Sequence, residues 1–262
     1  MSISFLKQKI QPETCHIWYA DVTDEHDLFR HLISSEENER YVSFRRSKDR
    51  DRALVSYSLV RLVLAHYTDL QPYELNIIRT CPQCGKSHGK PRLVMHPDDH
   101  LQFNVSHSGN IVIMAVTVEN PVGIDVEQID PRLSAEELIK KVLSPSERQV
   151  LFQLPKEERV QHFYTYWTRK EAILKATGQG LTIPLEHVTV SCPTERAELL
   201  MWANEQERVD RFTMHDLHLW EDYKACLAVI GTCKKVEVKN GSALLADWRH
   251  SDKTLRQSGY LS

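Results

Sequence analysis

The chain of 262 residues lacks an excess of basic residues, a long apolar run and a cysteine-rich pattern. Its formal net charge of −3 excludes the global basic excess of a nonspecific nucleic-acid binder, so any anion site has to be local. The longest apolar run, Ile111 to Val118, is too short to span a bilayer, and the N-terminal MSISFLKQKI lacks the apolar core of a signal peptide. We therefore expect a cytoplasmic protein that binds neither membranes nor nucleic acid.

Six cysteines are too few for a disulfide scaffold in a chain of this length. Four of them are expected in the core: Cys15, Cys192, Cys226 and Cys233. Cys81 and Cys84 instead form a CPQCG segment that is followed by His88. One CxxC pair is half of a zinc site, which His88 and a distant cysteine could complete. The alternative is a shaped loop whose Lys90 either reaches a phosphate or stays in solvent.

The sequence shows no low-complexity linker, heptad run or repeat, yet it divides near Pro121. Before this point the pattern predicts strands at residues 16–22, 74–80, 102–105 and 111–118 and a helix at about 50–67. After it the pattern predicts strands at 122–127, 187–191 and 225–230, and helices that begin at the capping boxes 134–137 and 144–147. Helices beside short strands, without regular alternation, favour an α+β fold with antiparallel sheets. We expect an N-terminal half at 1–120, a C-terminal half at 121–240 and a polar tail at 241–262.

The segment FYTYWTRKEAILKATGQGL, from Phe163 to Leu181, predicts a helix that ends at Gly178. Lys170 falls at the centre of its apolar stripe, and Glu171 lies between two aromatic side chains. Buried charge is costly unless it is paired or holds a ligand or metal. The alternative is an exposed pair of Glu171 with Lys175, worth about 0.2–0.5 kcal/mol. The outer face is expected to hold Thr165, Thr168, Arg169, Ala172 and Ala176.

Asp125 and Glu127 stand two residues apart on a predicted strand, so both point to one face while Ile124 and Val126 point into the core. Two carboxylates about 4 Å apart repel by about 4 kcal/mol at an effective dielectric constant of 20. Their convergence is explained by a cation between them, and an all-oxygen ligand set favours Mg²⁺. An exposed edge-strand face is the alternative. Glu171 is the natural third ligand.

Asn104 to Gly109, NVSHSG, ends one strand and turns toward the next. Ser106 and His107 are neighbours on an extended segment and point to opposite sides, which excludes a Ser-His hydrolase pair. A turn with hydroxyls, an imidazole and free amides suits an anion such as phosphate, whereas an ordinary polar hairpin is the alternative.

Phe44 to Arg52, FRRSKDRDR, carries five cations against two acids, and Arg40 precedes it. Lys48 and Arg52 lie one helical turn apart and could grip a phosphate ligand. A solvated helix face with internal Arg/Asp pairs is the alternative for most of these residues.

Taken together, FNVSHSG, VGIDVE and FYTYWTRKEAILKATGQGL, with the upstream HGKP and ERYVSF segments, resemble the 4′-phosphopantetheinyl transferases. The length resembles that of the larger, surfactin-synthetase-activating class. The resemblance covers roughly Arg40 to Leu181, and it implies a pseudo-dimer of two similar α+β halves, with coenzyme A and Mg²⁺ held between them. The N-terminal half would be the coenzyme A side, and the C-terminal half would carry the Mg²⁺ and the catalytic helix.

The family's reaction moves the phosphopantetheine arm of coenzyme A to a serine of an apo acyl or peptidyl carrier protein and leaves adenosine 3′,5′-bisphosphate. By resemblance, Asp125, Glu127 and Glu171 would hold Mg²⁺, with Asp125 and Glu171 the safer assignments. Glu171, directly or through water, would take the serine proton, and Lys175 would stabilise the attacked phosphate. The residues expected to bind coenzyme A are Arg40, Arg52, Lys90, Asn104, Ser106, His107, Lys170 and Lys175. An internal pseudo-dimer needs no second chain, so we expect a monomer.

Two other hypotheses stay open at this point. One is a Mg²⁺-dependent coenzyme A phosphoanhydride hydrolase that uses the same acids with water as the nucleophile. The other is a noncatalytic binding module built on a zinc-bound CPQCG loop, with the acids serving only structure.

Overall fold

The computed structural model describes residues 9–24, 27–81, 84–87, 89–94, 100–132, 136–178, 183–202, 209 and 211–257. The first half contains β1 (Thr14–Asp21), α1 (Ser35–Ser43), α2 (Ser47–Tyr67), β2 (Ile77–Ile78), β3 (Arg92–Leu93), β4 (Leu101–Ser108) and β5 (Ile111–Val118). The second contains β6 (Val122–Gln128), α3 (Glu136–Val142), α4 (Pro145–Gln153), α5 (Lys156–Thr177), β7 (Val188–Val190), β8 (Leu199–Trp202), β9 (Phe212–Asp216) and β10 (Tyr223–Ile230). The chain then forms β11 (Lys235–Asn240) and α6 (Gly241–Gln257).

The two halves have the same topology. In the first, β1 is followed by the long helix α2, the small hairpin β2-β3 and the strands β4 and β5, which pair in the order β1-β5-β4. In the second, β6 is followed by the long helix α5, the small hairpin β7-β8 and the strands β9 and β10, which pair in the order β6-β10-β9. These pairs are antiparallel. The predicted α+β fold of two similar halves, each a small antiparallel sheet packed with helices, is confirmed.

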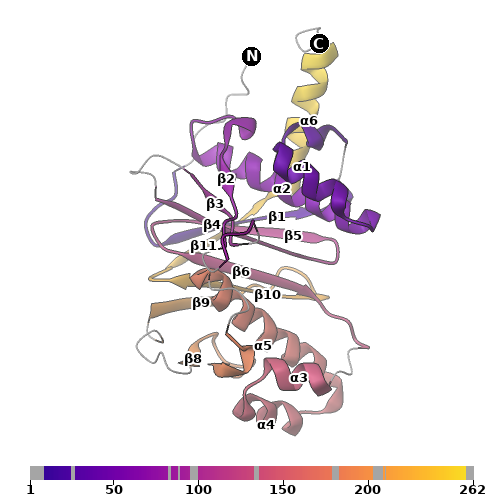
Figure 1. The fold of residues 1–262 in the computed structure, drawn as a ribbon. Helices are drawn as coiled ribbons and strands as arrows, with labels where there is room; N and C mark the ends of the chain where they lie inside the picture. The colour runs from indigo at the N-terminus through magenta and orange to yellow at the C-terminus, as the bar shows by residue number, and fades with distance from the viewer. Residues whose placement is uncertain are drawn as a thin grey trace.

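The halves stack as four layers, with the two sheets in the middle and helices on both outer sides (Figure 1). One apolar cluster joins the first sheet to α2 and α6, and a second joins α5 to the second sheet. A third cluster lies between the sheets and includes Ile17 and Ile113 from one side and Ile124 and Leu227 from the other. Burial of this shared apolar surface holds the halves together. The exact place of a domain boundary near residue 120 stays a prediction.

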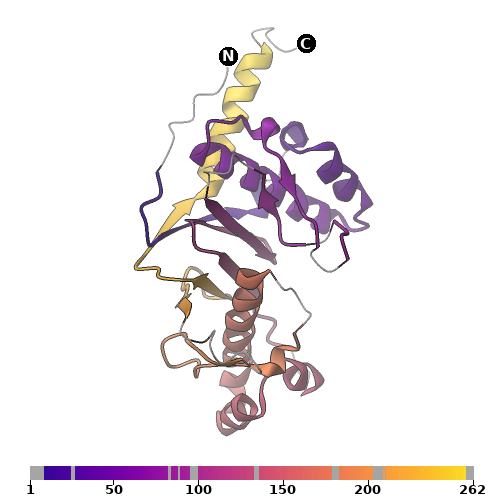
Figure 2. The ribbon, with the colours of Figure 1, turned by 60° about the vertical axis from the view of Figure 1, so that its left-hand side comes forward.

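Residues 235–257 return to the first half. Strand β11 pairs in parallel with β1, and Leu245 and Trp248 of α6 are buried in the cluster that contains α2. Figure 2 shows α6 beside the N-terminal helices, far from α5. The part of the expected polar tail that the structure describes is therefore a packed amphipathic helix, which polar composition alone did not reveal.

Helix α5 begins earlier than predicted, at Lys156, and ends as predicted, with Gly178 in the left-handed conformation at φ 71°. The expected outer face is wrong: Thr168, Arg169, Ala172 and Ala176 are buried, and Thr165 is half-buried. The guanidinium of Arg169 pairs with Asp216 of β9 at 2.6 Å and donates to the carbonyls of Ser191 and Cys192. From Phe163 to Gly178 no residue of this stretch is exposed, so the solvent face that a helical wheel assumes is missing there.

The capping box at Ser144 is present, with Pro145 in the first turn of α4, as predicted. The predicted box at 134–137 starts outside the described residues. No helix in the described ranges is long and apolar enough to cross a membrane.

Candidate functional site

The site forms where strand β4 of the first sheet runs beside strand β6 of the second. Alternate side chains of β4 face β6: the amide oxygen of Asn104 accepts the Ile124 N–H at 3.0 Å, and the Ser106 hydroxyl donates to Asp125 Oδ1 at 2.9 Å. One step further, Ser108 donates to Glu127 Oε2 at 2.7 Å. The period of two along a strand therefore places Asn104, Ser106 and Ser108 on the face of β4 that meets β6, and the two serines bond the predicted acids.

Asp125 lies at the centre of this arrangement and is 2 % exposed. Lys175 of α5 places its ammonium 2.6 Å from Asp125 Oδ1 and donates to the Ser106 hydroxyl at 2.8 Å. Among the described residues no group bonds the other oxygen, Asp125 Oδ2, although it is buried. Burial raises the pKa of Asp125, and Lys175 opposes that shift. A buried carboxylate oxygen without a partner is costly unless a ligand satisfies it.

Glu127 and Glu171 are half-buried beside Asp125. Burial, and then the charge of Asp125, raise the pKa of Glu127 to about 7. The same two causes raise the pKa of Glu171, while Lys175 acts against them. Each carboxylate thus makes ionisation of its neighbours harder, which is the electrostatic signature of acids that share a site with too little positive charge.

Gly123 sets how closely β6 approaches α5. A Cβ atom at this position would lie 2.0 Å from the carbonyl oxygen of Ala172 and 2.3 Å from the amide nitrogen of Ala176. Only a residue without a side chain allows this contact between strand and helix backbones. The contact brings Glu171 and Lys175, which flank Ala172 and Ala176 on α5, next to the carboxylates of β6.

The predicted metal ligands do not form a finished ligand cage. In the part of the chain that the structure describes, no three His, Cys, Asp or Glu side chains are grouped so that they could hold a metal ion as they stand. Lys175 instead takes the place of a cation at Asp125 Oδ1.

The zinc hypothesis gains nothing from the structure. Cys81 is buried and Cys84 is exposed, while His88 lies outside the described residues.

Lys90 reaches across the two halves. Its ammonium donates to the carbonyls of Val122, at the start of β6, and of Ala176, in the last turn of α5. Burial lowers the pKa of Lys90 to about 8. A cation at the C-terminal end of a helix interacts favourably with the helix dipole, so Lys90 also holds α5 in place.

Arg52 and His107 lie at the outer end of the site. The Arg52 guanidinium donates to the Gly109 carbonyl at 3.1 Å, and a surface pocket of about 290 Å³ is lined by residues that include Lys48, Arg52 and Gly109. His107 keeps exposed surface, yet partial desolvation, followed by the charge of Arg52, lowers its pKa to about 4. Its imidazole is therefore neutral at neutral pH. Arg40 donates to Glu36 and to the Ser87 carbonyl.

Lys170 is not part of this site. It is fully buried, and its ammonium donates to Glu147 of α4 and to the carbonyls of Val142 and Leu185. An ammonium has three donor hydrogens, so these partners use its whole capacity. The inward position predicted for Lys170 is confirmed, but the geometry argues against the expected contact with coenzyme A.

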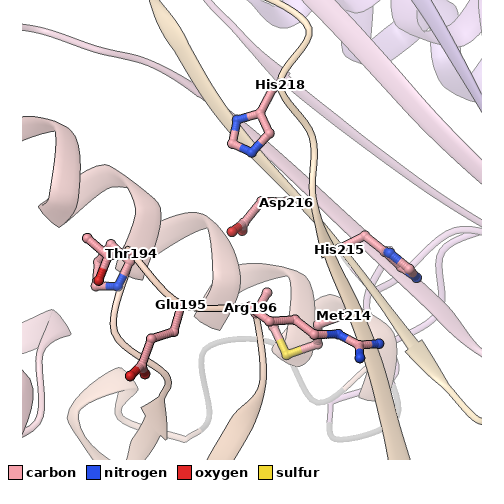
Figure 3. A pocket seen from close by; sticks show the side chains of 9 residues that line it. Thr194, Glu195, Arg196, Met214, His215, Asp216 and His218 are labelled. Carbon is pink, nitrogen blue, oxygen red and sulfur yellow. The ribbon is translucent and has the colours of Figure 1, made fainter.

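A separate pocket of about 380 Å³ lies on the other side of α5, between residues 193–197 and 214–218 (Figure 3). The Asp216 carboxylate there already binds Arg169 through both oxygens. We assign this pocket no role in the site.

Ser108 belongs to the predicted NVSHSG turn, but its bond to Glu127 was not foreseen, and Gln128 and Tyr223 were not predicted at all. Ser108 continues the alternation of Asn104 and Ser106, which was a usable signal. Gln128 and Tyr223 face each other across β6 and β10, and no local pattern marks them.

Comparison with known proteins matches the two halves separately. A model of the 4′-phosphopantetheinyl transferase superfamily matches residues 121–228, and a model named 4′-phosphopantetheinyl transferase, N-terminal, matches residues 18–119. Among curated relatives, the 4′-phosphopantetheinyl transferase HetI of Nostoc sp. is 33% identical over 189 residues, which cover 70% of this chain and 77% of that protein.

The 4′-phosphopantetheinyl transferase Sfp of Bacillus subtilis is 33% identical over 167 residues, 64% of this chain and 70% of Sfp. A relative from Synechocystis is 36% identical over 160 residues, which cover 61% of this chain and 63% of that protein. This chain therefore belongs to the 4′-phosphopantetheinyl transferase superfamily. Within it, the chain is of the Sfp-like class that its motifs and length predicted.

Proposed function

We propose that this protein transfers the 4′-phosphopantetheine arm of coenzyme A to a serine of an apo carrier protein, acyl or peptidyl. The observation that carries the proposal is the contact of Asp125 with Lys175 and Ser106, because it joins the three family motifs at one point. Family membership and similarity to proteins named 4′-phosphopantetheinyl transferases support the same activity.

We further propose that Asp125, Glu127 and Glu171 hold Mg²⁺. The fit rests on the partnerless buried oxygen of Asp125 and on the raised pKa of Glu127 and Glu171 beside it. Carboxylate oxygens without thiolates are ligands that Mg²⁺ prefers. When bound, the ion would neutralise charge on the pyrophosphate of coenzyme A. The ammonium of Lys175 would then leave Asp125 and bind a phosphate oxygen of coenzyme A.

The protein's own side chains have distinct tasks in the proposed reaction. Glu171 accepts the proton of the carrier serine, whose oxygen bonds to the phosphorus that carries the pantetheine. The anhydride bond of that phosphorus breaks, and adenosine 3′,5′-bisphosphate leaves. Lys175 stabilises the negative charge on the attacked phosphate.

Coenzyme A would lie along β4 and beside the N-terminal end of α2. Arg52 and His107 are placed to bind its phosphates at the outer end, with Ser106 nearer to Asp125. Lys90 has one donor hydrogen beyond its two carbonyl partners, which leaves it able to bind phosphate. Asn104 shapes the strand through its bond to Ile124, and Arg40 lies beside the 84–87 segment. We also propose that the protein is cytoplasmic and works as a monomer.

The test is the intact mass of an apo carrier protein after incubation with this protein, coenzyme A and Mg²⁺. We expect a gain of one phosphopantetheine, which EDTA abolishes and Mg²⁺ restores. Cleavage of coenzyme A without any carrier would instead support the phosphoanhydride hydrolase. Bound zinc in stoichiometric amount, with no turnover, would support the binding module.

A further inference from the structure

The turn between β4 and β5, residues 108–110, is held from the second half of the molecule. Ser108 donates to Glu127 Oε2 at 2.7 Å and accepts the N–H of Gln128 at 3.1 Å. The Asn110 N–H donates to the hydroxyl of Tyr223 at 3.2 Å. The turn therefore has partners on both β6 and β10, although it belongs to the first sheet.

Gly109 shows how closely the turn lies against these partners. Its φ of 55° is a conformation that other residues rarely adopt. A Cβ atom there would lie 2.4 Å from Oε1 of Gln128 and 2.5 Å from the Tyr223 hydroxyl. The opposite side of the turn faces Arg52, whose guanidinium binds the Gly109 carbonyl, and the pocket of about 290 Å³. Tyr223 and Gln128 thus pack against one side of the turn, and the proposed ligand would bind on the other side, beside Arg52.

The Tyr223 hydroxyl stands at the end of a fixed ring. Tyr223 is the cross-strand partner of Gln128, and its ring packs edge-on against Trp220 with centroids 5.8 Å apart. Trp220 in turn packs against Tyr19 of β1 at 5.5 Å. A hydroxyl on a ring held in this way offers the Asn110 N–H a partner at little entropic cost.

We infer that Tyr223 and Ser108 are positioning residues for coenzyme A: they fix the 108–110 turn against the second half so that Ser106, His107 and Arg52 are preorganised for the ligand. This inference rests on the proposed function, because that function places coenzyme A at the turn. Neither side chain needs to touch coenzyme A. Loss of either bond lets the free turn sample other conformations, so each binding event has to order it again.

The decisive variant is Tyr223→Phe, which removes one hydroxyl and keeps the ring. Its matched control is Tyr19→Phe in the same aromatic group, because the Tyr19 hydroxyl has no hydrogen-bond partner in the described ranges. For Tyr223→Phe we expect an unchanged melting temperature, faster hydrogen exchange of the 108–111 segment, and a Kd for coenzyme A raised by about 2- to 10-fold by calorimetry. In transfer assays KM for coenzyme A should rise while kcat stays.

Ser108→Ala should likewise speed hydrogen exchange of the 108–111 segment and raise the Kd for coenzyme A. The double variant should lose less affinity for coenzyme A than the sum of the two single losses. Both bonds order the same turn, so once one is lost the second has less order left to remove. Exchange and affinity that match those of Tyr19→Phe would overturn the inference. This outcome differs from failure of the proposed function, which is an absence of transfer by the unaltered protein. In that case hydrogen exchange of the 108–111 segment still tests whether Tyr223 and Ser108 hold the turn.

Discussion

Arg61 on α2 and Lys170 on α5 occupy matching positions in the two halves, equally far from the first residue of their helices. Each is a fully buried cation that donates to a glutamate of a capping box: Arg61 to Glu37, and Lys170 to Glu147. Each also donates to two backbone carbonyls. The positions of α2 that match Glu171 and Lys175 of α5 hold Leu62 and His66, so the buried cation recurs without these two site residues, and we expect it to serve the fold.

Lys170→Met should therefore destabilise the protein. It leaves Glu147 buried without its cation, which costs about 3–5 kcal/mol. Lys170→Arg should cost much less, because Arg61 makes the same contacts in the other half. Denaturant unfolding measures both changes. A normal unfolding free energy for Lys170→Met, together with weakened coenzyme A binding, would return Lys170 to the ligand site.

Asp125→Ala and Glu171→Ala should each remove most transfer activity while the protein stays folded. We expect losses of about 10²-fold or more in kcat/KM, because Asp125 is a proposed metal ligand and Glu171 is the proposed proton acceptor. Glu158→Ala, on an exposed turn of the same helix, is the control and should keep its rate. Rates like that of the unaltered protein in both site variants would refute the metal assignment.

His107→Ala should raise KM for coenzyme A, with a smaller effect when 3′-dephospho-coenzyme A replaces it. The reason is the place of His107 beside Arg52 at the outer end of the site, where we expect the 3′-phosphate. Initial rates with the two substrates give the comparison. An equal loss with both would remove His107 from the 3′-phosphate.

His16 should make the protein sensitive to acid. Desolvation, and then the charge of Lys239, lower the pKa of His16 to about 4, although the Glu237 carboxylate, 3.3 Å from Nε2, acts against this shift; Nδ1 contacts the Tyr67 hydroxyl at 2.7 Å. Between about pH 6.5 and 4 the unfolded chain thus binds a proton that the folded protein refuses, so stability falls as the pH falls. Between pH 6.5 and 5 the free energy of unfolding of the His16→Gln variant should fall by about 1–2 kcal/mol less than that of the unaltered protein. Parallel stability curves would contradict this.

Leu245→Ala should cost about 2–5 kcal/mol of unfolding free energy, because Leu245 of α6 is fully buried against the first half. The neighbouring Leu244 is only half-buried, and Leu244→Ala should cost clearly less. Thermal unfolding of both variants gives the comparison. Equal, small losses would mean that α6 adds little to the first half.

Local patterns foresaw the parts of the site that lie close together in the sequence. The alternation of Ile124 and Val126 with Asp125 and Glu127 gave the correct faces of β6, since strand geometry has a fixed period. The left-handed end of α5 at Gly178 was equally readable.

Long-range partners could not be read in this way. Arg169 looked exposed because its partner Asp216 lies on β9, brought close only by the second sheet. Lys170 looked available to a ligand because nothing in its own segment points to Glu147. The repeat of the two halves was predicted only from the family resemblance, because it consists of strand order and paired charges that leave no visible repeat in the sequence.

The return of β11 to β1 affects how the chain folds during synthesis. Strand β1 leaves the ribosome well before its parallel partner, residues 235–240, which follows the whole second half in the chain. Until then one edge of β1 stays open to pairing with other chains, which is a known route to aggregation. The first sheet therefore gains its last strand only after the second half has been made.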